Sequence, residues 1–132
     1  MAAVAKGAKR PRSALRAVLL QFQPLAVGLA GRGELRNLVG AEWEGGSIAP
    51  LGDALLCAFY LNELLVRLLP REDPHPQLYD GYRAALAALG QGEPIETTLR
   101  RFEWLLLRET GYAPDLARDT RHQPIDGQRL YR

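Results

Sequence analysis

The segment from Leu51 to Pro70 constrains the fold most, because it is apolar almost all the way round a helix. Its sequence is LGDALLCAFYLNELLVRLLP. Asp53 suits the first turn of a helix, Glu63 and Arg67 form a possible i,i+4 pair, and Pro70 ends the pattern. A helix with so few polar residues has to be buried on most faces. The segment therefore predicts a packed helical domain.

Two further segments have the periodicity of helices and are joined by short connections. The first follows EDPHP, with Asp73 as a possible N-cap, Pro74 at the first helical position and Gly90 at the end. The second lies in PIETTLRRFEWLLLRETG and ends at Gly111. Its predicted buried stripe consists of Ile95, Leu99, Phe102, Leu105 and Leu106. Three such helices with short loops indicate an α-helical bundle.

The first forty-odd residues have a different composition. Short apolar runs such as VLLQFQPLAVGLAG and RGELRNLVGAEWEGG are interrupted by glycine, which is typical of short strands and turns. The piece SALRAVL, from Ser13, fits either one short helix or the approach to a strand. At the other end, Asp126 and Gly127 form a hairpin signal between QPI and QRLYR. The expected fold class is α+β, with a small β structure followed by a helical bundle.

The amino-terminal stretch AVAKGAKRPRSALR is the only cationic block of the chain. The whole chain has 17 basic and 15 acidic residues, but this stretch has five basic residues and no acidic one. Lysine and arginine spaced along such a segment can displace counterions from nucleic-acid phosphates without reading bases. A nearby aromatic such as Phe22 could stack a base. The alternative is an ordinary solvated terminus.

Enzyme signatures are weak or absent. His75, His122 and Cys57 do not provide a zinc site or a Cys/His nucleophile pair, and we expect Cys57 to be a buried apolar residue. The sequence GLAGRG has neither dinucleotide-binding nor P-loop spacing, so its glycines are interpreted as turn residues. No apolar run reaches the roughly 18 residues of a membrane span. We expect a soluble, cytoplasmic, non-catalytic protein without a cofactor.

Some polar and aromatic residues in the helices have specific expected roles. Asn62 and Glu63 interrupt an apolar helix, which favours a hydrogen-bonded contact between helices. Arg100 and Arg101 point about 100° apart on a helix, so at least one is free to meet an acidic partner. The two tryptophans are expected to be packing residues, although Trp104 could face a groove.

Five segments, taken in order, resemble the RecO family of bacterial recombination mediators. They are VAKGAKRPRSALRAVLLQFQPL, GRGELRNLVGAE, LCAFYLNELLVRLLP, LYDGYRAALAAL and LRRFEWLLLRETGY. The resemblance implies an OB-fold β barrel followed by a helical domain and a non-catalytic role in DNA repair. It further implies binding of single- and double-stranded DNA, annealing, and loading of RecA together with RecR onto strands coated by single-stranded DNA-binding protein.

The resemblance also assigns site residues. The expected DNA-binding positions are Lys6, Lys9, Arg10, Arg12 and Arg16. Family members bind the acidic, phenylalanine-ended tail of single-stranded DNA-binding protein on the helical domain. Here LRRFE provides Arg100 as the first candidate for the carboxylate of this tail and Arg101 as the second.

The expected domains are a partial OB fold over 1–46 and a helical domain with the start of a carboxyl-terminal region over 51–132. By the resemblance the chain begins inside the barrel, ends before the usual carboxyl terminus and belongs to the branch without zinc. The expected location is the cytoplasm, in association with the nucleoid. The alternative function is a helical module that binds an acidic peptide and no DNA.

Overall fold

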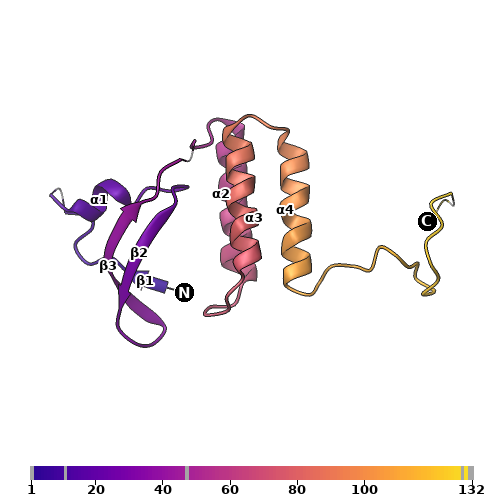
Figure 1. Cartoon of the computed structure of the whole chain (residues 1–132), viewed down its shortest axis with the longest axis horizontal. Coiled ribbons are helices and arrows are strands. Elements are labelled where there is room, and N and C mark those ends of the chain that lie inside the picture. The colour runs from indigo at the N-terminus through magenta and orange to yellow at the C-terminus, as the bar shows by residue number, and fades with distance from the viewer. Residues whose placement is uncertain (1, 11, 47, 129, 131–132) are drawn as a thin grey trace.

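The computed structural model describes residues 2–10, 12–46, 48–128 and 130, and the fold is α+β (Figure 1). A small sheet with one short helix comes first. Three longer helices then lie side by side, and the chain leaves the last of them as an extended tail. The predicted fold class is therefore confirmed.

The sheet has three strands in the order β1-β3-β2. Their bounds are β1 Ala2–Val4, β2 Leu25–Ala30 and β3 Leu35–Trp43. β2 and β3 are antiparallel, with a register shift between Gly28 and Leu29, while β1 runs parallel to β3. Gly31 and Gly33, both with φ of +101°, lie in the turn between β2 and β3. Because glycine adopts positive φ without steric cost, the turn interpretation of GLAGRG is confirmed for Gly31 and Gly33. It is wrong for Gly28, which lies within β2 and pairs with Gly40.

The described strands form an open sheet, not a closed barrel. Apolar side chains remain exposed on all its strands, including Val4, Val27 and Val39. Trp43 is also exposed, at 59%, and its indole Nε1 donates a hydrogen bond of 3.1 Å to Gln23 Oε1. The prediction that Trp43 is a packing residue is therefore wrong. The sheet is compatible with part of an OB fold.

The core of the described chain belongs to the helices. Their bounds are α1 Ala14–Val18, α2 Asp53–Leu68, α3 Pro76–Gly90 and α4 Ile95–Glu109. SALRAVL is thus a short helix, and the three long helices are confirmed. The buried apolar cluster consists of Ala58, Leu61, Leu78, Ala85, Leu86, Leu89, Phe102 and Leu106. All eight come from α2, α3 and α4.

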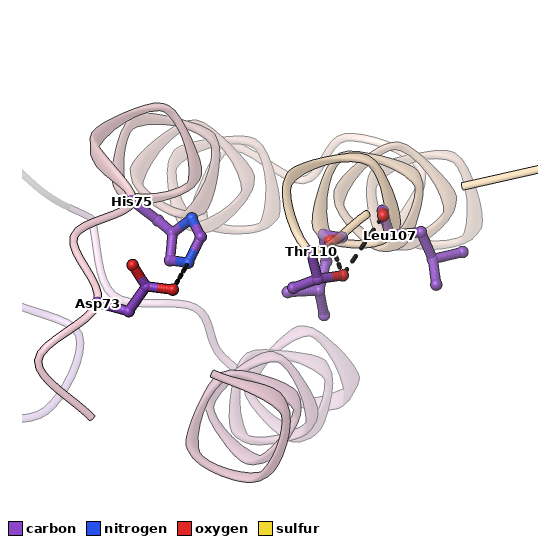
Figure 2. A network of polar contacts seen from close by, with 5 residues as sticks. Asp73, His75, Leu107 and Thr110 are labelled. Atoms are coloured by element: carbon purple, nitrogen blue, oxygen red, sulfur yellow. Dashed lines mark hydrogen bonds and ion pairs between the residues drawn. The ribbon is translucent and has the colours of Figure 1, made fainter. Parts of the chain in front are cut away.

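The start of α3 differs from the expected one. The helix begins at Pro76, with His75 as the N-cap residue at φ −127° and ψ 74°. A residue before proline is disfavoured in the α region, so the chain can turn into the helix only after His75. Asp73 is not the cap. Its carboxylate lies 3.1 Å from His75 Nε2 in the loop before the helix (Figure 2).

The predicted stripe of α4 is confirmed, and the helix ends as expected. Phe102 and Leu106 are buried, while the other three residues of the stripe pack partly buried against the core. At the carboxyl end, Thr110 Oγ1 donates to the carbonyl oxygens of Leu106 and Leu107, at 2.7 and 3.3 Å (Figure 2). Gly111 then takes φ of +82°, which stops the helix.

The expectation that α2 is buried on most faces is wrong. Only Ala58 and Leu61 are fully buried, whereas Val66 is 82% exposed and Leu56 is 68% exposed. Cys57 is half-buried against the core. In the described structure α2 contacts α3 and α4, and Phe59 packs against Phe22. Leu56, Val66 and Leu68 remain exposed to solvent.

The tail pairs at a different place from the expected hairpin. An isolated antiparallel bridge joins Arg118 to Pro124, and Asp119 Oδ1 accepts hydrogen bonds from the amides of Arg121 and Gln123. The second strand expected after Gly127 falls largely on residues 129, 131 and 132, which lie outside the described residues.

Candidate nucleic-acid and peptide interfaces

The five expected DNA-binding residues lie on one exposed segment. Between β1 and α1 the backbone makes successive tight turns, with hydrogen bonds from Arg10 N to Gly7 O and from Ser13 N to Arg10 O, both at 3.0 Å. Gly7 has φ of +73°. Lys6, Lys9, Arg10, Arg12 and Arg16 are all exposed, and together we call them the basic segment.

No carboxylate neutralises the basic segment within the described part of the chain. Arg36, on β3, instead forms an ion pair with Glu72 at 3.2 Å, and Arg67 pairs with Glu63 at 2.8 Å. Residues 1–46 contain seven basic and three acidic residues. A cluster of unpaired, solvated cations raises the local potential and attracts a polyanion. The five predicted residues therefore form an exposed, cationic stretch of the described chain.

On α4 the two neighbouring arginines have different surroundings. Arg100 Nη1 lies 2.9 Å from the Glu103 carboxylate, which also accepts a hydrogen bond of 2.7 Å from Tyr60 Oη on α2. The hydrogen bond to Glu103 raises the pKa of Tyr60 above its ordinary value, and burial adds to this. Arg101 has no hydrogen-bond or ion-pair partner among the described residues. The prediction that at least one arginine is unpaired is therefore confirmed.

Arg101 borders a groove of about 210 Å³ between α3 and α4. The apolar part of the groove is lined by Gly81, Ala84, Ala85, Ala88, Phe102 and Leu105. Gly81 lets α3 and α4 pack closely at this point, because a Cβ there would collide with a terminal methyl of Leu105. Small side chains on α3 thus leave room for an apolar group beside an unpaired guanidinium, and Glu93 adds one negative charge at the border.

The expected contact from the polar residues of α2 is confirmed. Tyr82 Oη on α3 donates a hydrogen bond to Asn62 Oδ1 on α2. Burial raises the pKa of the Tyr82 hydroxyl above its ordinary value. Tyr82 also stacks edge-on against Phe102, with ring centroids 6.2 Å apart. Together, these two contacts of Tyr82 join all three long helices.

Sequence reasoning missed a second cavity, between the sheet side and α3. It is lined by Tyr79, Tyr82 and Arg83 from α3 and by Phe22 from the segment before β2. The sequence contains a signal for one wall of this cavity, since Tyr79 and Arg83 are four residues apart and so share one helix face. No motif connected that face with the segment around Phe22, which is distant in sequence.

The described residues give no sign of a metal centre or a membrane span. They contain no group of three or more histidine, cysteine or acidic side chains arranged to hold a metal ion. None of the described helices combines the length and the apolar character needed to cross a bilayer.

Comparison with known proteins places this chain in a family. A family model described as Recombination protein O C terminal matches residues 52–132. DNA repair protein RecO of Burkholderia pseudomallei (strain 1710b) is 55% identical over 131 residues, covering 99% of this chain and 48% of the relative. The RecO protein of Azoarcus sp. (strain BH72) is 54% identical over 132 residues, covering 99% of this chain and 54% of the relative.

The chain spans about half the length of these curated relatives. The match includes both the strands and the helices, because it covers nearly every residue of the chain. The family model alone accounts for more than half of the chain, including the whole of α2, α3 and α4. The chain therefore belongs to the RecO family of DNA repair proteins.

Proposed function

We propose that this chain binds single- and double-stranded DNA through the basic segment and acts in repair as a mediator, not as a catalyst. One observation carries the proposal: five exposed cations share one short segment and have no carboxylate partner in the described structure. Phosphates repeat a negative charge along a strand, so each cation can replace a condensed counterion. Such contacts hold a strand without reading its sequence.

The proposed mechanism is electrostatic. Two complementary strands repel each other through their phosphates, and a cationic surface that binds both lowers this repulsion and promotes annealing. Relatives of this chain are named DNA repair proteins. As part of such a protein, the chain would help to load RecA, together with RecR, onto DNA that is coated by single-stranded DNA-binding protein.

The groove between α3 and α4 supports a second, compatible function. An acidic peptide that ends in phenylalanine would place its ring over the small side chains of α3 and its carboxylate on Arg101. Arg100 would add to the attraction, although Glu103 already neutralises it at 2.9 Å. We propose this groove as the binding site for the tail of single-stranded DNA-binding protein. If the basic segment binds no DNA, peptide binding at this groove remains as the alternative function.

The test of DNA binding replaces all five residues of the basic segment by alanine. On single-stranded DNA each lost phosphate contact lowers the slope of log affinity against log salt by about 0.7, so the slope should fall by up to about 3.5. Fluorescence anisotropy of a labelled oligonucleotide at several salt concentrations measures both affinity and slope.

The matched control removes the same number of charges elsewhere. The control residues are Arg67, Arg71, Arg108, Arg118 and Arg121, all of which are exposed. This variant has the same net charge as the test variant, so it should keep more of the affinity and the slope of the original chain. Equal losses in the two variants would show that net charge alone drives binding, and the proposal would then fail.

A further inference from the structure

The cavity between the sheet side and α3 has a volume of about 230 Å³. At about 30 Å³ for each water molecule in the liquid, this is the space of roughly eight waters. A single pyrimidine or purine base has a similar number of non-hydrogen atoms. The residues that line it include Phe22, Gly45, Gly46, Tyr79, Tyr82 and Arg83.

Aromatic rings form part of the wall and are held in place by other contacts. Phe22 stacks edge-on against Phe59 of α2, with centroids 5.1 Å apart and an interplanar angle of 73°. Tyr82 is fixed by its hydrogen bond to Asn62. Tyr79 is 51% exposed, so much of its ring is open to a ligand. Rings that are already held in position favour the binding of a planar π system, because little side-chain freedom is lost on binding.

A cation stands beside the open ring. The guanidinium carbon of Arg83 lies 5.9 Å from the centroid of the Tyr79 ring, and Arg83 has no carboxylate partner in the described part of the chain. Facing α3 across the cavity, Gly45 and Gly46 have φ of +78° and +80°, and a Cβ at either would meet no atom within 4 Å. Their backbone is therefore open to close approach.

These features together define the chemistry of a ligand. Aromatic and aliphatic walls favour a flat ring, while the unpaired guanidinium favours a phosphate next to that ring. A nucleotide unit has both groups, a flat base and a neighbouring phosphate. We propose that this cavity receives one unpaired base of a DNA strand, with Arg83 at the adjoining phosphate. The inference rests on the proposed DNA binding and adds a base-dependent contact to it.

The proposal predicts a difference between strands that have bases and strands that do not. A short oligothymidine and a strand of the same length made of abasic sites present the same phosphates to the basic segment. Stacking one base is worth at least about 1 kcal/mol, so the chain should bind oligothymidine at least about fivefold more tightly. The ratio should change little with salt, because the base is uncharged.

Two variants of the full chain test the site. Ala87→Trp fills the cavity from an exposed helix position, and Tyr79→Ala removes the open ring. Either change should bring the ratio of the two affinities close to one while binding to the abasic strand persists. The control is Tyr112→Ala, since Tyr112 is 80% exposed and lies outside the cavity. A fluorescent adenine analogue in the strand should be quenched on binding, and Ala87→Trp should remove the quenching.

The outcomes separate this inference from the proposed function. An unchanged base preference in Ala87→Trp and Tyr79→Ala would overturn the base-binding cavity alone, provided that the variant without the basic segment loses all DNA binding. A base preference that is absent from the original chain would also overturn it. Unquenched fluorescence together with capture of an aromatic peptide, abolished by Ala87→Trp, would identify a protein ligand and refute the DNA assignment.

Discussion

At the scale of single residues, position on a helix decides which of two identical side chains is available. Arg100 and Arg101 are adjacent in sequence, yet Glu103 neutralises the first and the second borders the groove without a partner. The cause is the rotation of about 100° between successive helical residues. The sequence could predict that the two differ. It could not predict which one is paired, because Tyr60 of α2 also holds Glu103 in place.

The hydroxyl of Tyr82 provides a prediction about stability. Tyr82→Phe removes the hydrogen bond to Asn62 and leaves a partly buried amide oxygen without its donor. We expect the free energy of unfolding to fall by about 1–2 kcal/mol, the usual cost of an unpaired polar group. Urea unfolding followed by circular dichroism measures this. Tyr112→Phe is the control and should change nothing, because Tyr112 is 80% exposed.

The same hydroxyl has a signature in pH. Burial raises the pKa of Tyr82 above its ordinary value of 10.0, so folding favours the neutral hydroxyl. The corresponding stability is complete below pH 10.0 and is lost as the pH rises from there through the raised value. Tyr82→Phe should therefore lose less stability than the original chain above pH 10.0. Identical pH profiles would contradict this assignment.

At the scale of elements, the sequence predicts the positions of the helices well. It predicts less well which other elements pack against them. The three long helices and the buried stripe of α4 follow from periodicity and from flanking proline and glycine. The start of α3 required the restriction that Pro76 places on His75, which outweighed the capping preference of Asp73. The exposed side of α2 could not be predicted, since burial depends on which elements are present to pack against it.

The end of α3 provides a prediction about packing. A Cβ at Gly90 would collide with the backbone carbonyl of Ile48, which cannot move as a side chain can. Gly90→Ala should therefore cost about 1–3 kcal/mol of unfolding free energy through overpacking. This outweighs the gain from the helix propensity of alanine, which is about 1 kcal/mol in a helix interior and smaller at Gly90, the last residue of α3. Thermal or urea unfolding shows whether the free energy of unfolding falls or rises in this variant.

The matched control is Gly40→Ala, because a Cβ at Gly40 would meet no atom within 4 Å. It should leave stability nearly unchanged. If Gly90→Ala were instead stabilising, the linker before α2 would not be packed against the end of α3. The walls of the neighbouring cavity, which include Ile48, would then also be displaced.

At the scale of the whole molecule, the basic segment and the groove between α3 and α4 lie far apart. Figure 1 shows the basic segment and α1 at one end of the long axis, and α4 on the far side of the bundle. Between them, the sheet is tied to the bundle by the pair of Arg36 with Glu72 and by the contact of Phe22 with Phe59. Neither surface shares a residue with the other.

This separation predicts that DNA and an acidic peptide bind at the same time. A labelled acidic peptide ending in phenylalanine should keep its affinity, within about twofold, when an oligonucleotide saturates the basic segment.

Arg101→Glu should weaken peptide binding by about tenfold or more, corresponding to ~1.4 kcal/mol, and should leave oligonucleotide binding largely intact. Arg100→Glu should have the smaller effect, because Glu103 already neutralises Arg100. Fluorescence anisotropy with each labelled ligand measures all of these affinities. Competition between the two ligands would mean that they share a surface, and a larger loss in Arg100→Glu would place the peptide carboxylate on the side of α4 that faces α2.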